Sequence, residues 1–370
     1  MADARKVIPQ SPEEWLKEVK HLDLDKVTIH DAPLKSASRA EFEQFLLLRV
    51  VWKSYDSSKF LRRVDLSQAL PDARTRLKGL GSWTNYKNSF TGPVQQGTFA
   101  LARHYQLQVT RTDQDSPTGS GVQFTPVAHR TRSKQQTGQP PAQPDFTKSP
   151  PTNPDPNFDT ALLDDESDSM SVVSSPLVRT PWSPIRPEDE FLYPPTKDEQ
   201  IVNTALLTFL DSLTLHFDLS VGWSIHRMAF KATFTNMEFQ ARTDGYLADS
   251  KGDIKAIVEV KPVIRNNKET QIRIQESHQI VANLLADYTS PHVQRRNKPH
   301  RLIISQDRHE IYISVAEYDD NYIDYLQTGQ TRNNPFLVMH QYGPWDTLNP
   351  DAMDDLGPII LALTAIAQTY

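Results

Sequence analysis

Proline is concentrated in one long segment near the middle of this chain. Of the 27 prolines in the 370 residues, 15 lie between Pro117 and Pro195, among serine, threonine, glutamine and aspartate. Proline has no backbone N–H to donate, and a segment with so few apolar side chains buries too little surface to offset the conformational entropy lost on folding. We therefore predict a disordered linker over residues 113–188, which leaves regions 1–112 and 189–370 to form the folded structure.

Several classes of function are excluded by residues and motifs that the chain lacks. It contains no cysteine, which rules out disulfides, thiolate nucleophiles and cysteine zinc sites. No GxGxxG, GxxxxGK[ST], GxSxG or HExxH motif is present, so nucleotide-phosphate cradles, nucleophile elbows and zincin sites have no support. No stretch approaches the roughly 18 apolar residues of a membrane span, and the start of the chain lacks the apolar run of a signal peptide. We expect an intracellular protein, nuclear or cytoplasmic, that is not secreted and has no membrane partner.

Charge is distributed unevenly along the chain. Residues 1–112 carry 18 Lys+Arg and 12 Asp+Glu, residues 113–190 carry 6 and 12, and residues 191–370 carry 16 and 22. An acidic C-terminal half binds polyanions poorly unless a cation or a basic surface assists it. The basic first region could supply that surface, with Trp83 and Tyr86 as aromatic platforms, although aromatic residues at such spacing are more often core.

Region 1–112 is predicted to be mostly helical. Ser11 is followed by a proline and, three residues later, by Glu14, which is a capping box that begins a helix. A second capping box at Ser38 precedes an apolar run through Val50, which predicts a longer helix there. The role of this region does not follow from its sequence.

Region 189–345 has the alternating pattern of an α/β domain. Amphipathic periodicity predicts helices over residues 197–216 and 269–287. Runs rich in β-forming residues predict strands over residues 221–234, 237–247, 254–262, 301–306 and 310–316. Helix, three strands, helix and further strands form a layered α/β pattern, and residues 346–370 are predicted to end the chain with a helix that packs on the core.

Two of these predicted strands turn charged side chains toward a common face. Because side chains alternate along a strand, Glu259 and Lys261 share a face with Ile257. Residues 248–253 resemble a hairpin turn, and a symmetric turn would put Asp244 opposite Ile257 and diagonal to Glu259. Diagonal neighbours lie about 7–8 Å apart at Cα, which is close enough for two carboxylates to share one cation.

A divalent cation explains why two acids and an amine would gather in this way. Neighbouring carboxylates repel each other and are costly to bury, and a cation removes both problems. Mg²⁺ prefers a few carboxylate oxygens together with waters and phosphate oxygens, so we predict that Asp244 and Glu259 bind Mg²⁺ or Mn²⁺. Lys261 is predicted to hold or deprotonate the metal-bound water, which requires a partly desolvated lysine with a lowered pKa.

The Glu-x-Lys triplet is informative only in its setting. Residues 18–20 spell the same Glu-Val-Lys as residues 259–261, but they lie on a predicted helix with no acidic strand before it. Residues 259–261 lie in a β-run, after a strand that carries an aligned acid, and between two helices. This context distinguishes the second triplet as a candidate site.

With these features, residues 190–345 resemble the PD-(D/E)XK nuclease superfamily, and particularly the nuclease-like domains of many fungal proteins. Asp244 matches the first acid of that motif, residues 259–261 match its (D/E)-x-K, and Thr243 stands where the nominal proline would be. The resemblance implies a restriction-endonuclease-like core of helix, central mixed β-sheet and helix. It also implies a Mg-dependent hydrolase of phosphodiester bonds that acts on nucleic acid, with DNA favoured over RNA.

The resemblance implies further site residues. It implies that the Val260 carbonyl ligates the metal and that an acid on the preceding helix does so too, with Glu199 as the match and Asp198 as the neighbouring alternative. Many members contact the substrate from the helix that follows the motif lysine. On that helix Gln275 and Gln279 lie one turn apart and are the implied substrate-binding residues.

Two other interpretations remain open. A nuclease-like domain that has lost catalysis would act as a nucleic-acid- or protein-binding module; the intact motif favours the enzyme, whereas the acidic surroundings and the long linker favour the module. In the other interpretation, region 1–112 is the functional unit and binds nucleic acid or protein by itself. Steep salt dependence of DNA binding by that region would support it.

Overall fold

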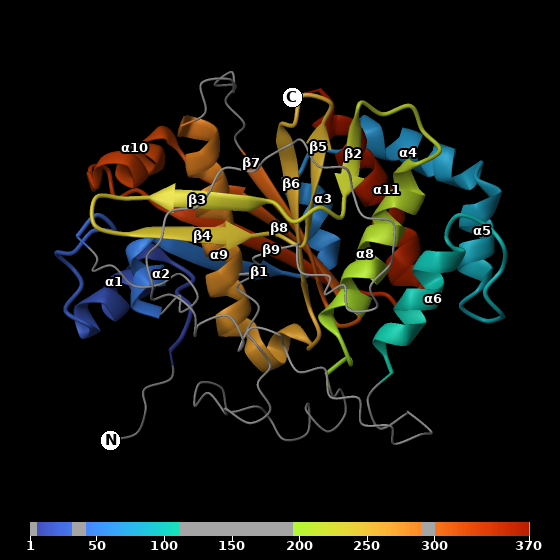
Figure 1. The fold of residues 1–370 in the computed structure, drawn as a ribbon, viewed down its shortest axis with the longest axis horizontal. Helices are drawn as coiled ribbons and strands as arrows, with labels where there is room; N and C mark the ends of the chain where they lie inside the picture. The colour runs from blue at the N-terminus through green and yellow to red at the C-terminus, as the bar shows by residue number, and fades with distance from the viewer. Residues whose placement is uncertain (1–5, 32–41, 112–194, 290–299, 370) are drawn as a thin grey trace, which may run out of the picture. The chain divides into compact units, whose positions relative to one another are not determined.

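A mixed β-sheet of seven strands lies at the centre of the protein, and it confirms the predicted α/β class (Figure 1). The computed structural model describes residues 6–31, 42–111, 195–289 and 300–369, so the predicted linker over residues 113–188 lies outside the described residues. The strands of this sheet are β1 (Val50–Tyr55), β2 (Val221–Ser224), β5 (Gly245–Asp249), β6 (Ile254–Lys261), β7 (His300–Asp307), β8 (Glu310–Glu317) and β9 (Leu337–Asp346). Their order is β1-β9-β8-β7-β6-β5-β2, in which β1–β9 and β6–β7 are parallel and the other neighbours are antiparallel.

Helices cover both faces of this sheet. One face is covered by α8 (Glu199–Thr214), α11 (Pro350–Ala367), α3 (Phe60–Arg63), α4 (Ala69–Lys78), α5 (Gly81–Asn88) and α6 (Ala100–Val109). The other face is covered by α9 (Arg265–Thr289), α1 (Pro12–His21), α2 (Phe42–Leu47), α10 (Asp320–Thr328) and a two-stranded sheet of β3 (Ala229–Thr233) and β4 (Glu238–Arg242). A short 3-10 helix, η2 (Ser57–Lys59), follows β1.

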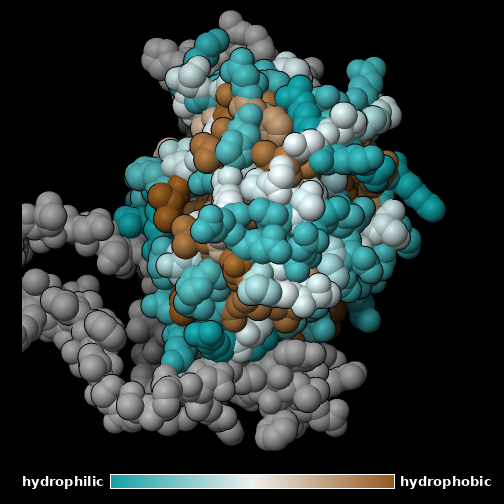
Figure 2. Space-filling model, turned by 90° about the vertical axis from the view of Figure 1, so that its right-hand side faces the viewer, coloured by the Kyte–Doolittle hydropathy of each residue, from teal (hydrophilic) through white to brown (hydrophobic). Residues whose placement is uncertain are grey.

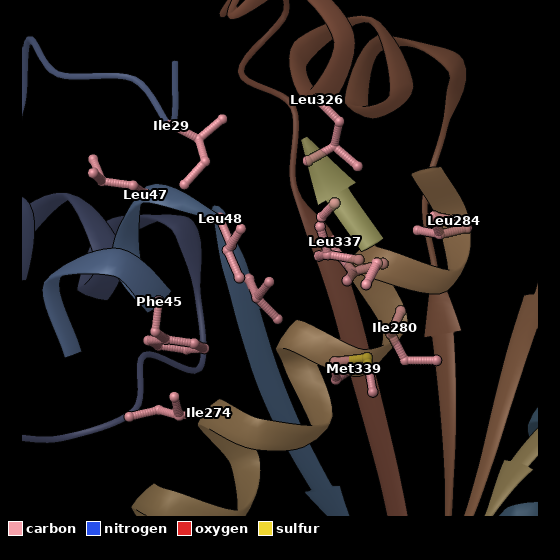
Figure 3. Close-up of a cluster of buried hydrophobic side chains, with 14 of the residues drawn as sticks. Ile29, Phe45, Leu47, Leu48, Ile274, Ile280, Leu284, Leu326, Leu337 and Met339 are labelled. Carbon is pink, nitrogen blue, oxygen red and sulfur yellow. The ribbon is translucent and has the colours of Figure 1, made fainter. Parts of the chain in front are cut away.

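Each face of the sheet has its own hydrophobic core, because side chains alternate along the strands. Val258 and Val260 of β6 lie in the core with α8 and α11, whereas Ile257 lies in the core with α9. Figure 3 shows the second core, in which Ile274 and Ile280 of α9 lie beside the side chains of the β1 and β9 region. Full burial of each such side chain stabilises the fold by about 1.5–3 kcal/mol.

The described part of residues 6–111 shares these cores with the C-terminal part. Strand β1 pairs with β9, with Val50 opposite Leu337, while α4 packs on α11 and α6 packs on α8. Trp83 and Tyr86 are each 2% exposed, so they are core residues and not aromatic platforms for nucleic acid. The described residues therefore belong to one compact unit.

The N-terminal helices follow their local signals only in part. Ser11 caps α1 as predicted, and its Oγ accepts the Glu14 backbone N–H at 3.3 Å. The longer helix predicted to run through Val50 is wrong: α2 has six residues, Arg49 has a φ of 55°, and β1 follows at once. Pairing with β9 overrides the apolar pattern that indicated a helix, and the capping box at Ser38 lies outside the described residues.

Two of the predicted strands are each divided in two. The chain leaves the main sheet at residues 225–228, between β2 and β3, and it returns after Thr243 and Asp244, between β4 and β5. The β3–β4 pair packs on α9 instead, where the Phe239 ring lies edge-on to His278 with centroids 4.9 Å apart. The sequence has continuous β-forming runs here and does not mark the two breaks. The choice between the two sheets depends on packing against a helix that is distant in sequence.

One face of the protein is mostly hydrophilic, with scattered apolar side chains. On the face that carries α4, α5 and α6, the hydrophobic areas are small and separated from one another (Figure 2). Leu101 on α6 is 52% exposed and Leu215 is 71% exposed, but isolated apolar side chains of this kind are ordinary on protein surfaces. Among the helices that the structure describes, none is both long enough and apolar enough to span a bilayer.

Candidate active site

Asp244 lies where the chain re-enters the main sheet. Its backbone N–H donates to the Val258 carbonyl at 3.0 Å; Gly245, the first residue of β5, pairs with the same Val258, and Ile257 pairs with Tyr246. The expectation that Asp244 faces Ile257 is therefore wrong. The pairing register shifts by one residue between Leu247 and Ala248, so the hairpin is not symmetric as the prediction assumed.

Close backbone contacts fix both neighbours of Asp244. A Cβ on Gly245 would lie 2.6 Å from the Ser224 carbonyl oxygen, so the strands can approach this closely only with glycine at that position. Thr243 donates its backbone N–H to the Met228 carbonyl at 3.0 Å, a hydrogen bond that proline could not make. The backbone that carries the acid is thus held on both sides.

Asp244 is 7% exposed, and both oxygens of its carboxylate have partners. Oδ2 accepts the Val260 backbone N–H at 3.1 Å, and Oδ1 lies 3.2 Å from Nη2 of Arg227. On the helix side, Asn203 of α8 donates its side-chain amide to the Asp244 carbonyl at 3.2 Å. The acid is therefore oriented by β6, by α8 and by the loop that carries Arg227.

Glu259 is 1% exposed, and three donors surround its carboxylate. Oε1 accepts from Lys261 Nζ and from Gln275 Nε2, and Oε2 accepts from Gln279 Nε2, each at 2.5 Å. Burial raises the pKa of Glu259 to about 8 against the opposing charge of Lys261, and the charge of Asp244 adds to the rise. The neighbouring donors therefore stabilise the ionised carboxylate by less than burial destabilises it.

Lys261 directs its amine into the site, and its side chain is 13% exposed. Nζ lies 2.5 Å from Glu259 Oε1 and donates to the Val260 carbonyl at 2.9 Å. Burial by itself lowers the pKa of Lys261, but the charges of Glu259, Glu199 and Asp244 outweigh it and raise the pKa above its ordinary value. The expected lowering of this pKa is wrong, because three carboxylates surround the amine; Lys261 is a cation and a hydrogen-bond donor here, not a base.

Glu199 begins α8 and faces the same group of charges. Burial raises the pKa of Glu199, Lys261 and Arg227 oppose that rise, and Asp244 adds to it. The alternative acid, Asp198, is exposed and is the N-cap of α8, where its Oδ1 accepts a backbone N–H of the first turn at 2.8 Å. The structure therefore brings Glu199 to the site and gives Asp198 a capping role.

The donor chemistry of this site suits a hard divalent cation. Asp244 and Glu259 supply buried carboxylate oxygens, the Val260 carbonyl follows Glu259 in β6 and accepts from Lys261 Nζ, and burial raises the pKa of Glu259 by more than Lys261 offsets. Over the ranges that the structure describes, however, no three His, Asp or Glu side chains converge as a ready metal cage. A cation here would need water and substrate oxygens as further ligands, and Asp244 would have to be released by Arg227.

Sequence reasoning missed both side chains that hold Asp244. Arg227 lies in a segment whose pattern indicates one continuous strand, and no local feature marks it. Asn203 lies beside the apolar residues Val202 and Leu206 on α8 and is 1% exposed. A polar amide buried next to an apolar stripe needs a partner, and that signal could have found it.

A second cluster of buried charges borders the site and was also missed. Arg265, at the start of α9, is 1% exposed, and its guanidinium contacts Glu276 Oε1 and Asp307 Oδ2, each at 2.5 Å. Glu276 and Asp307 are 11 and 42 positions from Arg265 in sequence, so no local motif connects them. Burial raises the pKa of Asp307 to about 6 against the charge of Arg265, and Asp307 pairs with Lys261 across β6 and β7.

Comparison with known proteins identified no relative of this chain. No protein-family model, curated protein or solved structure matches the chain. What the site can do follows from its own groups: two buried acids, a third acid at a helix start, a largely buried amine and two amides.

Proposed function

We propose that this protein is a metal-dependent nuclease that hydrolyses phosphodiester bonds of nucleic acid through a PD-(D/E)XK-type site on a restriction-endonuclease-like core. The observation that carries the proposal is the convergence of two buried carboxylates and a largely buried amine. Asp244 accepts the backbone N–H of Val260, the residue after Glu259, and Lys261 Nζ contacts the Glu259 carboxylate. Charged side chains are seldom buried together unless they are paired or bind an ion. The order of α8, the β5–β6 hairpin, α9 and β7 also agrees with such a core.

Each residue has a defined part in this proposal. Asp244, Glu259 and the Val260 carbonyl would hold Mg²⁺ or Mn²⁺, with Glu199 as a further oxygen donor. The ion, when bound, supplies a Lewis acid and a water of lowered pKa. Lys261, as a cation, offsets the negative charge that develops on the phosphate and orients water by donating a hydrogen bond.

The two glutamines of α9 would position the substrate. Gln275 and Gln279 both donate to Glu259 at 2.5 Å, so they already reach the point where the acids meet. An amide that loses Glu259 as its acceptor can donate to a phosphodiester oxygen instead. DNA is the first substrate to test, followed by RNA.

A cleavage assay with a matched lysine control tests this proposal. Lys261→Met should lower the cleavage rate about 100-fold, because it removes the cation that offsets charge in the transition state. Lys20→Met changes the same Glu-Val-Lys triplet on the exposed side of α1 and should leave the rate unchanged. Rates are measured on single- and double-stranded DNA and RNA with Mg²⁺, with Mn²⁺ and with EDTA. Equal rates in wild type and Lys261→Met, or no metal-dependent cleavage in either, would contradict the proposal.

Metal binding should also depend on pH through Glu259. Its pKa is raised to about 8 in the absence of metal, so near neutral pH the carboxyl must lose its proton to bind a cation. We expect the affinity for Mn²⁺ to rise by about tenfold per pH unit below pH 8 and to level off above it, with about one proton released per ion bound. Calorimetry in two buffers of different ionisation enthalpy measures that proton, and Glu259→Gln should abolish its release. Binding that is independent of pH between about 6 and 8 would rule this mechanism out.

The same raised pKa has a consequence for stability. The folded-state pKa of Glu259 lies above the ordinary value of 4.5, so its contribution to the free energy of unfolding is fully present below about pH 4.5 and is lost as the pH rises toward 8. A bound cation would restore that loss by favouring the ionised carboxylate. Metal should therefore raise the midpoint of thermal unfolding more at pH 8 than at pH 6.

A specific observation also favours a second candidate, a nucleic-acid- or protein-binding module without catalysis. Both oxygens of Asp244 and both oxygens of Glu259 already have protein partners, which can balance the charges without a metal ion. Such a module would bind its partner equally well with metal or with EDTA. We prefer the nuclease, because the pKa of Glu259 stays raised despite these partners.

A further inference from the structure

Arg227 lies at the site without a part in the reaction outlined above. It belongs to the connection at residues 225–228, where the chain passes from β2 to β3. Its Nη2 lies 3.2 Å from Asp244 Oδ1, and its side chain is 39% exposed. The partly exposed guanidinium therefore pairs with a carboxylate oxygen that a metal ion would need as a ligand.

The backbone on either side of Arg227 is anchored, which leaves its side chain as the movable part. His226 donates its backbone N–H to Ser224 Oγ at 3.1 Å. Met228 accepts the Thr243 N–H at 3.0 Å and donates its own N–H to Thr243 Oγ1 at 3.3 Å. A long, partly exposed arginine on a fixed backbone changes partners by rotamer changes alone.

The charges at the site give such a movement a direction. When they are ionised, Glu199, Asp244 and Glu259 outnumber Lys261 and Arg227 by one negative charge. A divalent cation would turn this balance to one positive charge, and it would repel a guanidinium held on the same carboxylate. A phosphodiester is a monoanion that matches the remaining charge, and the guanidinium fork binds phosphate oxygens in pairs.

We propose that Arg227 is a displaceable counterion of Asp244 that competes with the divalent cation for this carboxylate and moves to the substrate phosphodiester when the cation binds. This inference rests on the proposed nuclease function. It implies that Arg227 lowers the affinity for the metal ion and raises the affinity for the substrate. No residue that acts only in folding would have that pair of effects.

Two binding measurements on the full-length protein test the inference. Arg227→Gln should bind Mn²⁺ up to about fivefold more tightly than wild type, which is the most that a partly exposed ion pair contributes. The same variant should bind a cleavage-resistant phosphorothioate oligonucleotide more weakly in the presence of Mn²⁺, and the slope of log affinity against log salt should fall by about one. Mn²⁺ binding is measured by electron paramagnetic resonance and oligonucleotide binding by fluorescence anisotropy.

Two further variants make the outcome decisive. Lys231→Gln removes a positive charge from β3, where the lysine is 61% exposed and pairs with Glu238, and it should change neither affinity. If Asp244→Asn abolishes Mn²⁺ binding but Arg227→Gln binds Mn²⁺ no more tightly than wild type, the counterion role is wrong and the metal site stands. If wild type itself binds no Mn²⁺, the proposed function and this inference both fail.

Discussion

Replacement of Asp244 by asparagine should lower metal-dependent cleavage by about 10³-fold or more and leave the fold intact. Asparagine has the same shape, and its Oδ1 can still accept the Val260 N–H that now reaches the carboxylate at 3.1 Å. The neutral amide is a poor ligand for a hard cation and cannot balance its charge. Cleavage rates with Mg²⁺ and Mn²⁺ measure the loss, and the midpoint of thermal unfolding shows whether the fold is kept.

The neighbouring acid on α8 provides a matched control. Asp198→Asn also turns an aspartate into its amide, but Asp198 is the exposed N-cap of α8, and asparagine caps helices as well as aspartate does. Its cleavage rate should equal that of wild type. Glu199→Gln should fall between the two variants, at about a tenfold loss, because Glu199 is a further oxygen donor at the edge of the site. Full cleavage by Asp244→Asn, or an equal loss in Asp198→Asn, would refute the assignment of the metal ligands.

Arg265→Met should lower the free energy of unfolding by about 3–5 kcal/mol. The guanidinium is buried and contacts Glu276 and Asp307 at 2.5 Å each, so its removal leaves two carboxylates in the core without their cation. Methionine fills part of the space but supplies no charge. Urea denaturation at pH 8 measures the loss. At pH 5 the loss should be smaller, because the pKa of Asp307 is already raised to about 6 and this carboxyl can take up a proton once it is unpaired.

An exposed arginine on α4 is the control for this stability prediction. Arg76 pairs with Asp72 one helical turn away, and its side chain is 44% exposed. Arg76→Met should change the free energy of unfolding by less than about 0.5 kcal/mol, because solvent screens such pairs. A cost below about 1 kcal/mol for Arg265→Met would mean that the buried network does not hold α9 to the sheet.

The Arg265 network and the candidate active site meet at the ends of β6 and β7. Asp307 pairs with Lys261 in the parallel register, and the Arg308 backbone N–H donates to the Lys261 carbonyl at 2.8 Å. Arg265 also fixes the start of α9, the helix that carries both glutamines of the site. The network therefore positions the lysine and the amides without contacting the proposed substrate.

Local sequence patterns predicted most of the secondary structure around the site. The helices predicted over residues 197–216 and 269–287 are α8 and α9, and the last three predicted strands are β6, β7 and β8. Alternation along β6 also predicted that Glu259 and Lys261 share a face, as the 2.5 Å contact between them confirms. These features depend on residues two to four positions apart, whose relative directions the geometry of a helix or strand determines.

The geometry of the site and its further groups were decided by the tertiary structure. The pairing of β5 with β6 placed the Asp244 carboxylate at the Val260 N–H, the division of two β-runs brought Arg227 to Asp244, and β1 pairs with β9, which is distant in sequence. The charge state of Lys261 is the clearest case: sequence predicted a lowered pKa from burial, whereas three carboxylates raise it. Strand pairing and electrostatic environment are sums over groups distant in sequence, and a local pattern carries no information about them.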